Sequence, residues 1–140
     1  MARKIAAILI VAALTLAILS PAADIAAAII EVSGRQMSGL ASWYAEFSPG
    51  IRKTTANMEI FDHDKMTCAM WDVPFDTILK VTNVENEKTV YVRVNDRGPA
   101  RRLVKEGRVI DLTKASFEKI ADLRKGLVRV RVELISSPKS

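Results

Sequence analysis

Asp96 is the residue whose setting best suits acid–base chemistry. It follows a run, 90–94, in which valines alternate with polar residues, and this period of two predicts a half-buried strand. If the strand continues, the Asp96 carboxyl lies on the side that the valines bury, where loss of water favours the protonated form that a general acid needs. Arg97 would oppose this effect if it came close. The alternative is a structural role, in which Asp96 caps a turn formed by Gly98 and Pro99.

Glu59 and Asp62 are further candidate acids, three residues apart. Most glycosidic bonds are cleaved by a pair of carboxyl groups, of which one protonates the leaving oxygen and the other acts as base or nucleophile. In an extended chain these two side chains face opposite ways, so only a turn brings both to one site. The alternative is that both are solvated surface charges.

Trp43 and Tyr44 are adjacent aromatic residues, so on a strand one faces the core and the other faces outward. An outward ring can lie against a sugar, whereas an inward ring packs in the core. Both roles are open for this pair.

His63 is the single histidine and Cys68 the single cysteine, which excludes a histidine-based metal cluster and argues against a zinc site. His63 lies between Asp62 and Asp64, a setting typical of an exposed side chain. Cys68 has apolar neighbours and no disulfide partner in the chain, so we expect a buried thiol. The sequence also lacks a glycine-rich phosphate loop and a nucleophile elbow, and we expect neither a metal nor an organic cofactor.

The same period of two predicts further strands. Two are expected at 77–84 and 128–134, and two shorter ones at 40–44 and 66–71. The residues at 83–88 form the turn between the 77–84 strand and the strand that leads to Asp96.

One helix is predicted, from Thr113 to Lys125. Thr113 is a suitable N-cap, Phe117 and Ile120 lie on an apolar stripe, and Gly126 stands where the helix would end. Several short strands with one helix in about 100 residues predict a small, mostly β barrel.

The N-terminus has the three parts of a secretory signal. Arg3 and Lys4 precede an apolar run from Ile5 to Leu19, and small residues stand at 21–23. We therefore expect cleavage near Asp24 and a domain outside the cytoplasm, in the periplasm, in the cell wall or secreted. The alternative is an uncleaved membrane anchor, because the run nearly reaches the roughly 20 residues that span a bilayer. A lipid anchor is not expected, because no cysteine follows the run directly.

Composition fits one modest globular unit, since the 140 residues are 49% hydrophobic. The expected division is a signal or anchor at 1–23, a linker at 24–38, the domain at 39–135 and a tail at 136–140. The net charge is +5, but the basic residues are dispersed and form no stripe that would follow a phosphate backbone. Nucleic acid is therefore not an expected partner, whereas acidic cell-wall polymers are compatible with this charge.

Several short motifs follow one another along the chain. They are Gly39 to Tyr44 (GLASWY), Thr55 to Asp62 (TANMEIFD), Thr67 to Met70 (TCAM), Val73 to Thr77 (VPFDT), Val92 to Pro99 (VRVNDRGP) and Ile110 to Thr113 (IDLT). Together they resemble the rare lipoprotein A (RlpA) family of bacterial endolytic peptidoglycan transglycosylases. The resemblance implies a six-stranded double-psi β-barrel, related to the expansin and barwin barrels.

The same resemblance implies a chemistry. Asp96 corresponds to the family's catalytic acid, and Glu59 and Asp62 to two further acidic site residues. The implied reaction cleaves the bond between N-acetylmuramic acid and N-acetylglucosamine in peptidoglycan glycan strands without water or cofactor, and it leaves a 1,6-anhydro end. The residues expected to contact the glycan are Trp43, Tyr44, Asn95 and Arg97.

Three positions depart from the family's motifs. Met70 stands where the family has histidine, and Met58 and Asp76 stand where it has glycine. The missing histidine favours an alternative function, that of a barrel of expansin type that binds glycan without cleaving it.

Overall fold

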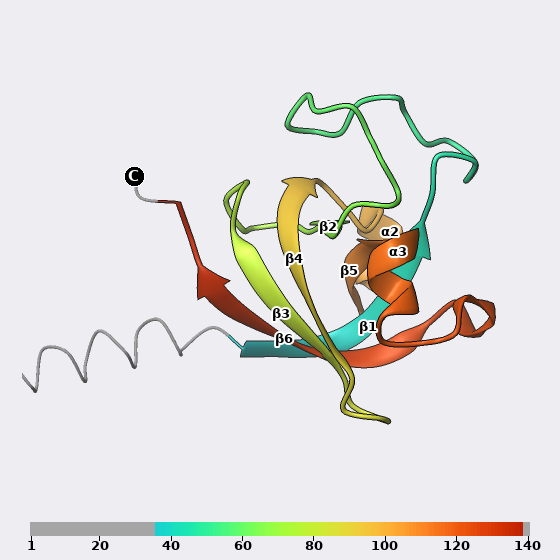
Figure 1. The fold of residues 1–140 in the computed structure, drawn as a ribbon, viewed down its shortest axis with the longest axis vertical. Helices are drawn as coiled ribbons and strands as arrows, with labels where there is room; N and C mark the ends of the chain where they lie inside the picture. Colours follow the sequence, from blue (N-terminus) through green and yellow to red (C-terminus); the bar gives the residue numbers. More distant parts are fainter. Residues whose placement is uncertain (1–35, 139–140) are drawn as a thin grey trace, which may run out of the picture.

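The computed structural model describes residues 36–138, which fold into a closed barrel (Figure 1). Its six strands are β1 (Gln36–Tyr44), β2 (Thr67–Ala69), β3 (Ile78–Asn83), β4 (Thr89–Asp96), β5 (Arg108–Thr113) and β6 (Val128–Ser136). Around the barrel the order is β1-β5-β2-β4-β3-β6. The predicted signal or anchor at 1–23, and most of the predicted linker, lie outside the described residues. Within 36–138, none of the helices has the length and apolar character needed to cross a bilayer.

The short strand β2 joins the two halves of the barrel. It pairs in parallel with β4 and antiparallel with β5, while β1 pairs in parallel with β5. The remaining pairs, β1 with β6, β3 with β4 and β3 with β6, are antiparallel. The 45–66 segment between β1 and β2, teal to green in Figure 1, extends beyond one end of the barrel.

The period of two in the sequence correctly predicts the barrel core. Val90, Val92 and Val94 of β4 are all buried, and so are the valines at 128, 130 and 132 of β6. They pack in one cluster with Phe117 and Ile120. Each buried valine contributes about 1.5–3 kcal/mol relative to an exposed one, so these alternating faces hold the barrel closed.

The predicted single helix from Thr113 to Lys125 is wrong. A short helix α3 (Lys114–Glu118) is followed by a separate 3₁₀ turn η1 (Leu123–Lys125), although Thr113 and Gly126 do bound the region as expected. The reason lies at Ile120, whose carbonyl oxygen accepts hydrogen bonds from the side chains of Asn83 and Asn86 at 2.9 and 3.0 Å. Asp122 then caps the new turn by accepting from the Arg124 amide.

Several element bounds also differ from the sequence-based expectation. β1 begins at Gln36 instead of Leu40, and β2 covers only three residues of the run 66–71. The strand β5 and the short helix α2 (Arg101–Val104) were not expected at all. β5 shows only Ile110 and Leu112 as an alternating apolar pair, which is too short a pattern to predict a strand.

Two of the three departures from the family motifs occupy left-handed backbone positions. Met58 has φ of 71° and Asp76 has φ of 65°. A side chain strains the backbone in this region, and glycine does not. The family's glycines at these places are therefore explained by backbone geometry.

Replacing Met58 with glycine should stabilise the domain by about 0.5–1 kcal/mol, because the strain is removed and the exposed side chain packs on little. Ile60→Gly is the matched control, since Ile60 is similarly exposed, at 81% against 77%, but has no positive φ. We expect Ile60→Gly to destabilise the domain. Urea unfolding of both variants checks this, and a stability loss in Met58→Gly equal to that of the control would contradict it.

Candidate active site

The 45–66 segment is held against the outer face of the barrel by a small apolar cluster. The rings of Tyr44 and Phe61 stack with centroids 4.7 Å apart and an interplanar angle of 8°. Both rings pack with Ala69 and Ile51, separately from the barrel core. Because Ala69 faces outward from β2 while Cys68 and Met70 face the core, this cluster fixes the segment beside the carboxyl end of β4.

Asp96 lies at the end of β4, in the cleft between the barrel and this segment. Its Oδ1 accepts hydrogen bonds from the backbone amides of Ala56 at 2.9 Å and Arg97 at 2.8 Å, and its Oδ2 lies 3.4 Å from the Tyr44 hydroxyl. The carboxyl is half-buried, as the strand parity predicts in part. The cleft has a volume of about 420 Å³ and is lined by Asp96, Arg97 and the 50–61 region.

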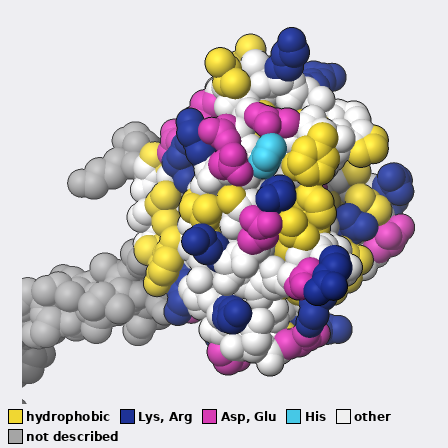
Figure 2. Space-filling model, turned by 45° about the vertical axis from the view of Figure 1, so that its right-hand side comes forward, with side chains coloured by type: hydrophobic (Ala, Val, Ile, Leu, Met, Phe, Trp, Pro, Cys, Tyr) yellow, Lys and Arg dark blue, Asp and Glu magenta, His cyan; other side chains and the backbone are white. Residues whose placement is uncertain are grey.

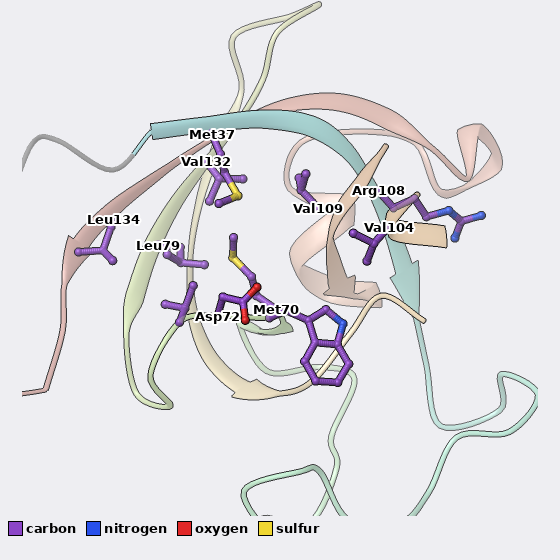
Figure 3. Close-up of a pocket in the computed structure, with 11 residues that line it drawn as sticks. Met37, Met70, Asp72, Leu79, Val104, Arg108, Val109, Val132 and Leu134 are labelled. Carbon is purple, nitrogen blue, oxygen red and sulfur yellow. The ribbon is translucent and has the colours of Figure 1, made fainter. Parts of the chain in front are cut away.

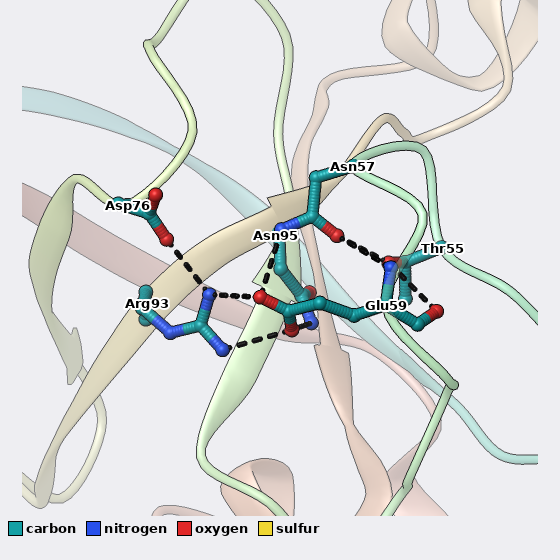
Figure 4. Close-up of polar contacts among 6 residues, drawn as sticks. All are labelled: Thr55, Asn57, Glu59, Asp76, Arg93 and Asn95. Atoms are coloured by element: carbon teal, nitrogen blue, oxygen red, sulfur yellow. Dashed lines mark hydrogen bonds and ion pairs between the residues drawn. The ribbon is translucent and has the colours of Figure 1, made fainter.

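Glu59 is held in an ion pair with Arg93 (Figure 4). Two guanidinium nitrogens of Arg93 donate to its two carboxylate oxygens at 2.7 and 2.9 Å, and the side chains of Asn95 and Asn57 donate at 3.0 and 2.9 Å. The hydrogen bonds from Arg93, and then that from Asn95, lower the pKa of Glu59 to about 2. Glu59 is therefore an anion at neutral pH and is not available as a proton donor.

The same ion pair connects the 45–66 segment to the barrel wall. Arg93 lies on β4, and its guanidinium also donates to Asp76 at 2.8 Å. Asp76, one of the departures from the family motifs, thus adds a second carboxylate to Arg93. Glu59 and Asp76 together hold the segment and the β3 approach against β4.

Asp62 and Trp43 lie elsewhere. The Asp62 carboxylate accepts from the backbone amide of Asp64 at 2.9 Å, which closes a local turn, and Asp62 does not line the Asp96 cleft. The Trp43 indole donates to the carbonyl of Leu123 at 3.0 Å, while its neighbour Tyr44 takes the cleft side of β1. The convergence of Glu59, Asp62 and Asp96 on one groove remains a prediction.

Asn95 and Arg97 have different positions beside Asp96. Asn95 is 4% exposed and its side chain donates to Glu59. The Arg97 guanidinium lies 3.8 Å from the centre of the Phe75 ring and donates to the Met70 carbonyl, and Arg97 lines the cleft. Arg97 is thus the predicted contact residue best exposed to a ligand in the cleft.

His63 lies on the surface, as predicted. It is the one cyan side chain in Figure 2, among acidic and hydrophobic neighbours. Its Nδ1 is 2.8 Å from a carboxylate oxygen of Glu46, and its ring is edge-on to Phe47.

Met70, at the family's histidine position, is 2% exposed and belongs to the barrel core. Its side chain lines a second, mainly apolar cavity of about 240 Å³, together with Leu79 and Val132 (Figure 3). Since Ala69 and Met70 alternate along β2, this cavity lies on the other side of the strand from the Asp96 cleft. In this backbone the residue at position 70 does not face Asp96.

Asp111 is the acidic residue that the sequence reasoning missed. It lies on β5, and the Ser42 hydroxyl donates to its Oδ1 at 2.5 Å. Burial raises the pKa of Asp111, and the nearby charge of Asp96 raises it further, while Ser42 and Arg108 oppose the shift. The IDLT motif and the shared parity of Ser42 and Tyr44 on β1 were the available signals.

Residues 36–132 match the protein family described as lytic transglycolase. The chain belongs to this family. It is 43% identical over 102 residues to the endolytic peptidoglycan transglycosylase RlpA of Vibrio cholerae, and 42% identical over 103 residues to that of Campylobacter jejuni. Each alignment covers 73% of this chain but only 36% and 35% of the relatives, so the chain spans about a third of their length.

Two solved structures confirm the double-psi β-barrel. The Streptomyces papain inhibitor aligns with a TM-score of 0.58 and 22% identity, covering 74% of this chain and 97% of the inhibitor. The apo Clavibacter michiganensis expansin aligns with a TM-score of 0.56 and 19% identity, covering 76% of this chain and 53% of the expansin. The predicted fold class of the lytic transglycolase domain is thus correct.

Glu59 should stabilise the fold in a pH-dependent way. Its pKa is lowered from 4.5 to about 2, so its contribution is present above pH 4.5 and is lost as the pH falls toward 2. In urea unfolding between pH 6 and 2, Glu59→Gln should be less stable than wild type at pH 6 and should lose less stability on acidification. Partial exposure of the pair keeps the effect modest.

Glu106→Gln is the control, because Glu106 is exposed and should leave the acid dependence of wild type unchanged. Parallel curves for wild type and Glu59→Gln would show that the Arg93 pair does not stabilise the fold.

Proposed function

We propose that this domain is an endolytic peptidoglycan transglycosylase, in which Asp96 is the acid and then the base. The observation that supports it most is the position of Asp96. Backbone amides and the Tyr44 hydroxyl orient its carboxyl in an open cleft at the end of β4, in a chain that belongs to the lytic transglycolase family. Curated relatives with about 40% identity carry the name of this activity.

The proposed reaction needs one carboxyl that changes role. Protonated Asp96 donates its proton to the oxygen between N-acetylmuramic acid and N-acetylglucosamine, and the bond from that oxygen to the muramoyl C1 breaks. The Asp96 carboxylate then removes the proton of the muramoyl 6-hydroxyl as its oxygen bonds to C1. The proton count closes, no water is consumed, and the products are a 1,6-anhydro end and a free 4-hydroxyl.

Other residues assist in this proposal without transferring the proton. Two backbone amides donate to Asp96 Oδ1, so its other oxygen is the one directed to the substrate, with Tyr44 beside it. The Glu59 anion stabilises positive charge that develops at C1, a kind of electrostatic effect often worth a few kcal/mol. Arg97 is a candidate contact for the glycan, and contacts by Trp43, Asn95 and Asp62 remain predictions.

A glycan-binding barrel without catalysis is the second candidate. Met70 in place of the family's histidine favours it, and so does the Glu59–Arg93 pair, which removes Glu59 as a proton donor. One expansin with this fold is described in complex with cellohexaose, which shows that a barrel of this kind binds a glycan chain in that protein.

Asp96→Asn separates the two candidates. The amide keeps an oxygen for the amides of Ala56 and Arg97, so the barrel should stay folded, with a melting temperature close to wild type. Release of anhydro ends from peptide-free glycan strands, measured by mass spectrometry, should fall by about 10²- to 10⁴-fold, the usual contribution of general acid–base catalysis. Asp64→Asn, an exposed acid in the same segment, is the matched control and should retain activity.

The binding module is the better account under one result. Wild type would bind glycan and release no anhydro product between about pH 4 and 8, and Asp96→Asn would bind equally well.

We also propose that the domain works outside the cytoplasm, after export by the N-terminal signal. The pattern of Arg3, Lys4 and the apolar run supports this, as does a cell-wall substrate. N-terminal sequencing of exported protein should find a start close to Asp24. Recovery of the intact chain in the membrane fraction would favour the anchor instead.

A further inference from the structure

We propose that Asp111, rather than Glu59 or Asp62, is the second acid of the reacting site and acts as a positioning residue for the Asp96 proton. The two carboxyl groups form a coupled pair that loses its last proton at a higher pH than a single carboxyl would. This inference rests on the proposed function for its catalytic consequence, but the pairing itself can be tested without substrate.

The barrel places both acids in one cross-strand row. Ala69 of β2 is the register partner of Asp111 on β5 and also of Asp96 on β4. Ser42 of β1 is the next member, opposite Asp111. Residues that are directly opposite project to the same face of a sheet, and two strand spacings amount to about 10 Å between the outer Cα atoms. The carboxyl groups, which project from the same face, thus lie within the range at which glycosidase acids cooperate.

The Asp111 carboxyl is held on both sides. Ser42 donates to its Oδ1, and its Oδ2 packs against Gly98, where an added Cβ would come within 3.1 Å of it. The same Cβ would lie 3.1 Å from the Ala69 side chain. Gly98 is two residues after Asp96, so the end of β4 forms one wall of the Asp111 site. Only a residue without a side chain fits between the two acids here.

Charged and titratable groups around Asp111 leave Asp96 as its anionic neighbour. The groups that shift it are Ser42 and Tyr44 of β1, Cys68 of β2, Asp96 of β4 and Arg108 of β5 itself. Burial raises the pKa of both Tyr44 and Cys68 far above neutrality, so both stay uncharged. The helices α2 and α3 also pack against β5, and in the described part of the chain none of their charged groups shifts Asp111.

Glu59 does not fit the role of second acid. It is fully engaged by Arg93 and the two asparagines and does not line the Asp96 cleft. Its pKa of about 2 places its titration below the range in which a cell-wall enzyme works. Asp111, in contrast, is half-buried, has one hydrogen-bond donor and carries a raised pKa.

The pH profile of anhydro-end release tests the catalytic consequence. Asp111→Asn removes one charge of the pair, so the upper limb of the profile should move to lower pH by about one unit. Ser42→Ala removes the bond that favours the Asp111 anion, so the upper limb should move to higher pH. Glu106→Gln, an exposed acid, should leave it unchanged. A residue with a merely structural role would lower the rate at all pH values without moving the limb, and that result would overturn the proposal.

A titration without substrate tests the pairing itself. The carbon-13 resonance of the Asp111 carboxyl should titrate at lower pH in Asp96→Asn than in wild type, and at higher pH in Ser42→Ala. An unmoved midpoint in Asp96→Asn overturns the pairing even in an active enzyme. Coupled carboxyls in a wild type that releases no anhydro product would instead contradict the proposed function and leave the pair standing.

Discussion

The position of β2 between β4 and β5 is the constraint on which the site depends. This three-residue strand pairs with one neighbour in parallel and with the other antiparallel, so Ala69 is opposite Asp96 on one side and Asp111 on the other. Its inward residues, Cys68 and the following Met70, join the core, and Ala69 leaves room on the outer face. A larger side chain there would separate the two acids and displace the Tyr44 and Phe61 rings. Closure of the barrel and assembly of the site are therefore one event in the fold.

Local surroundings give each acid a different function. Asp96 is oriented by backbone amides in a cleft, Glu59 is fixed as an anion by Arg93, and Asp111 is partly desolvated beside a single hydroxyl. Environments that push carboxyl groups apart in proton affinity are how one fold obtains an acid and a permanent anion together. The Glu59–Arg93 pair also fastens the 45–66 segment, so the cleft wall and the charge distribution share one interaction.

The sequence predicts those parts of the structure that repeat along the chain. Alternating valines at 90–94 and 128–132 predict inward faces correctly because burial on one side of a strand imposes that period. The helix from Thr113 fails because its end is set by Asn83 and Asn86, which are distant in sequence and compete for the Ile120 carbonyl. Asp96 was found from its strand parity. Asp111 was not, because its proximity to Asp96 arises only from register across β2, and Glu59 was given a catalytic role because its partner Arg93 is 34 residues away.

Cleavage without water at Asp96 is the central claim, and isotope labelling of the products tests it most directly. Wild-type protein would be incubated with peptide-free glycan strands in oxygen-18 water, and the new ends would be analysed by mass spectrometry. Attack by the muramoyl 6-hydroxyl predicts ends that are lighter than a reducing end by one water and carry no oxygen-18. Reducing ends that carry oxygen-18 would show hydrolysis and would contradict the account.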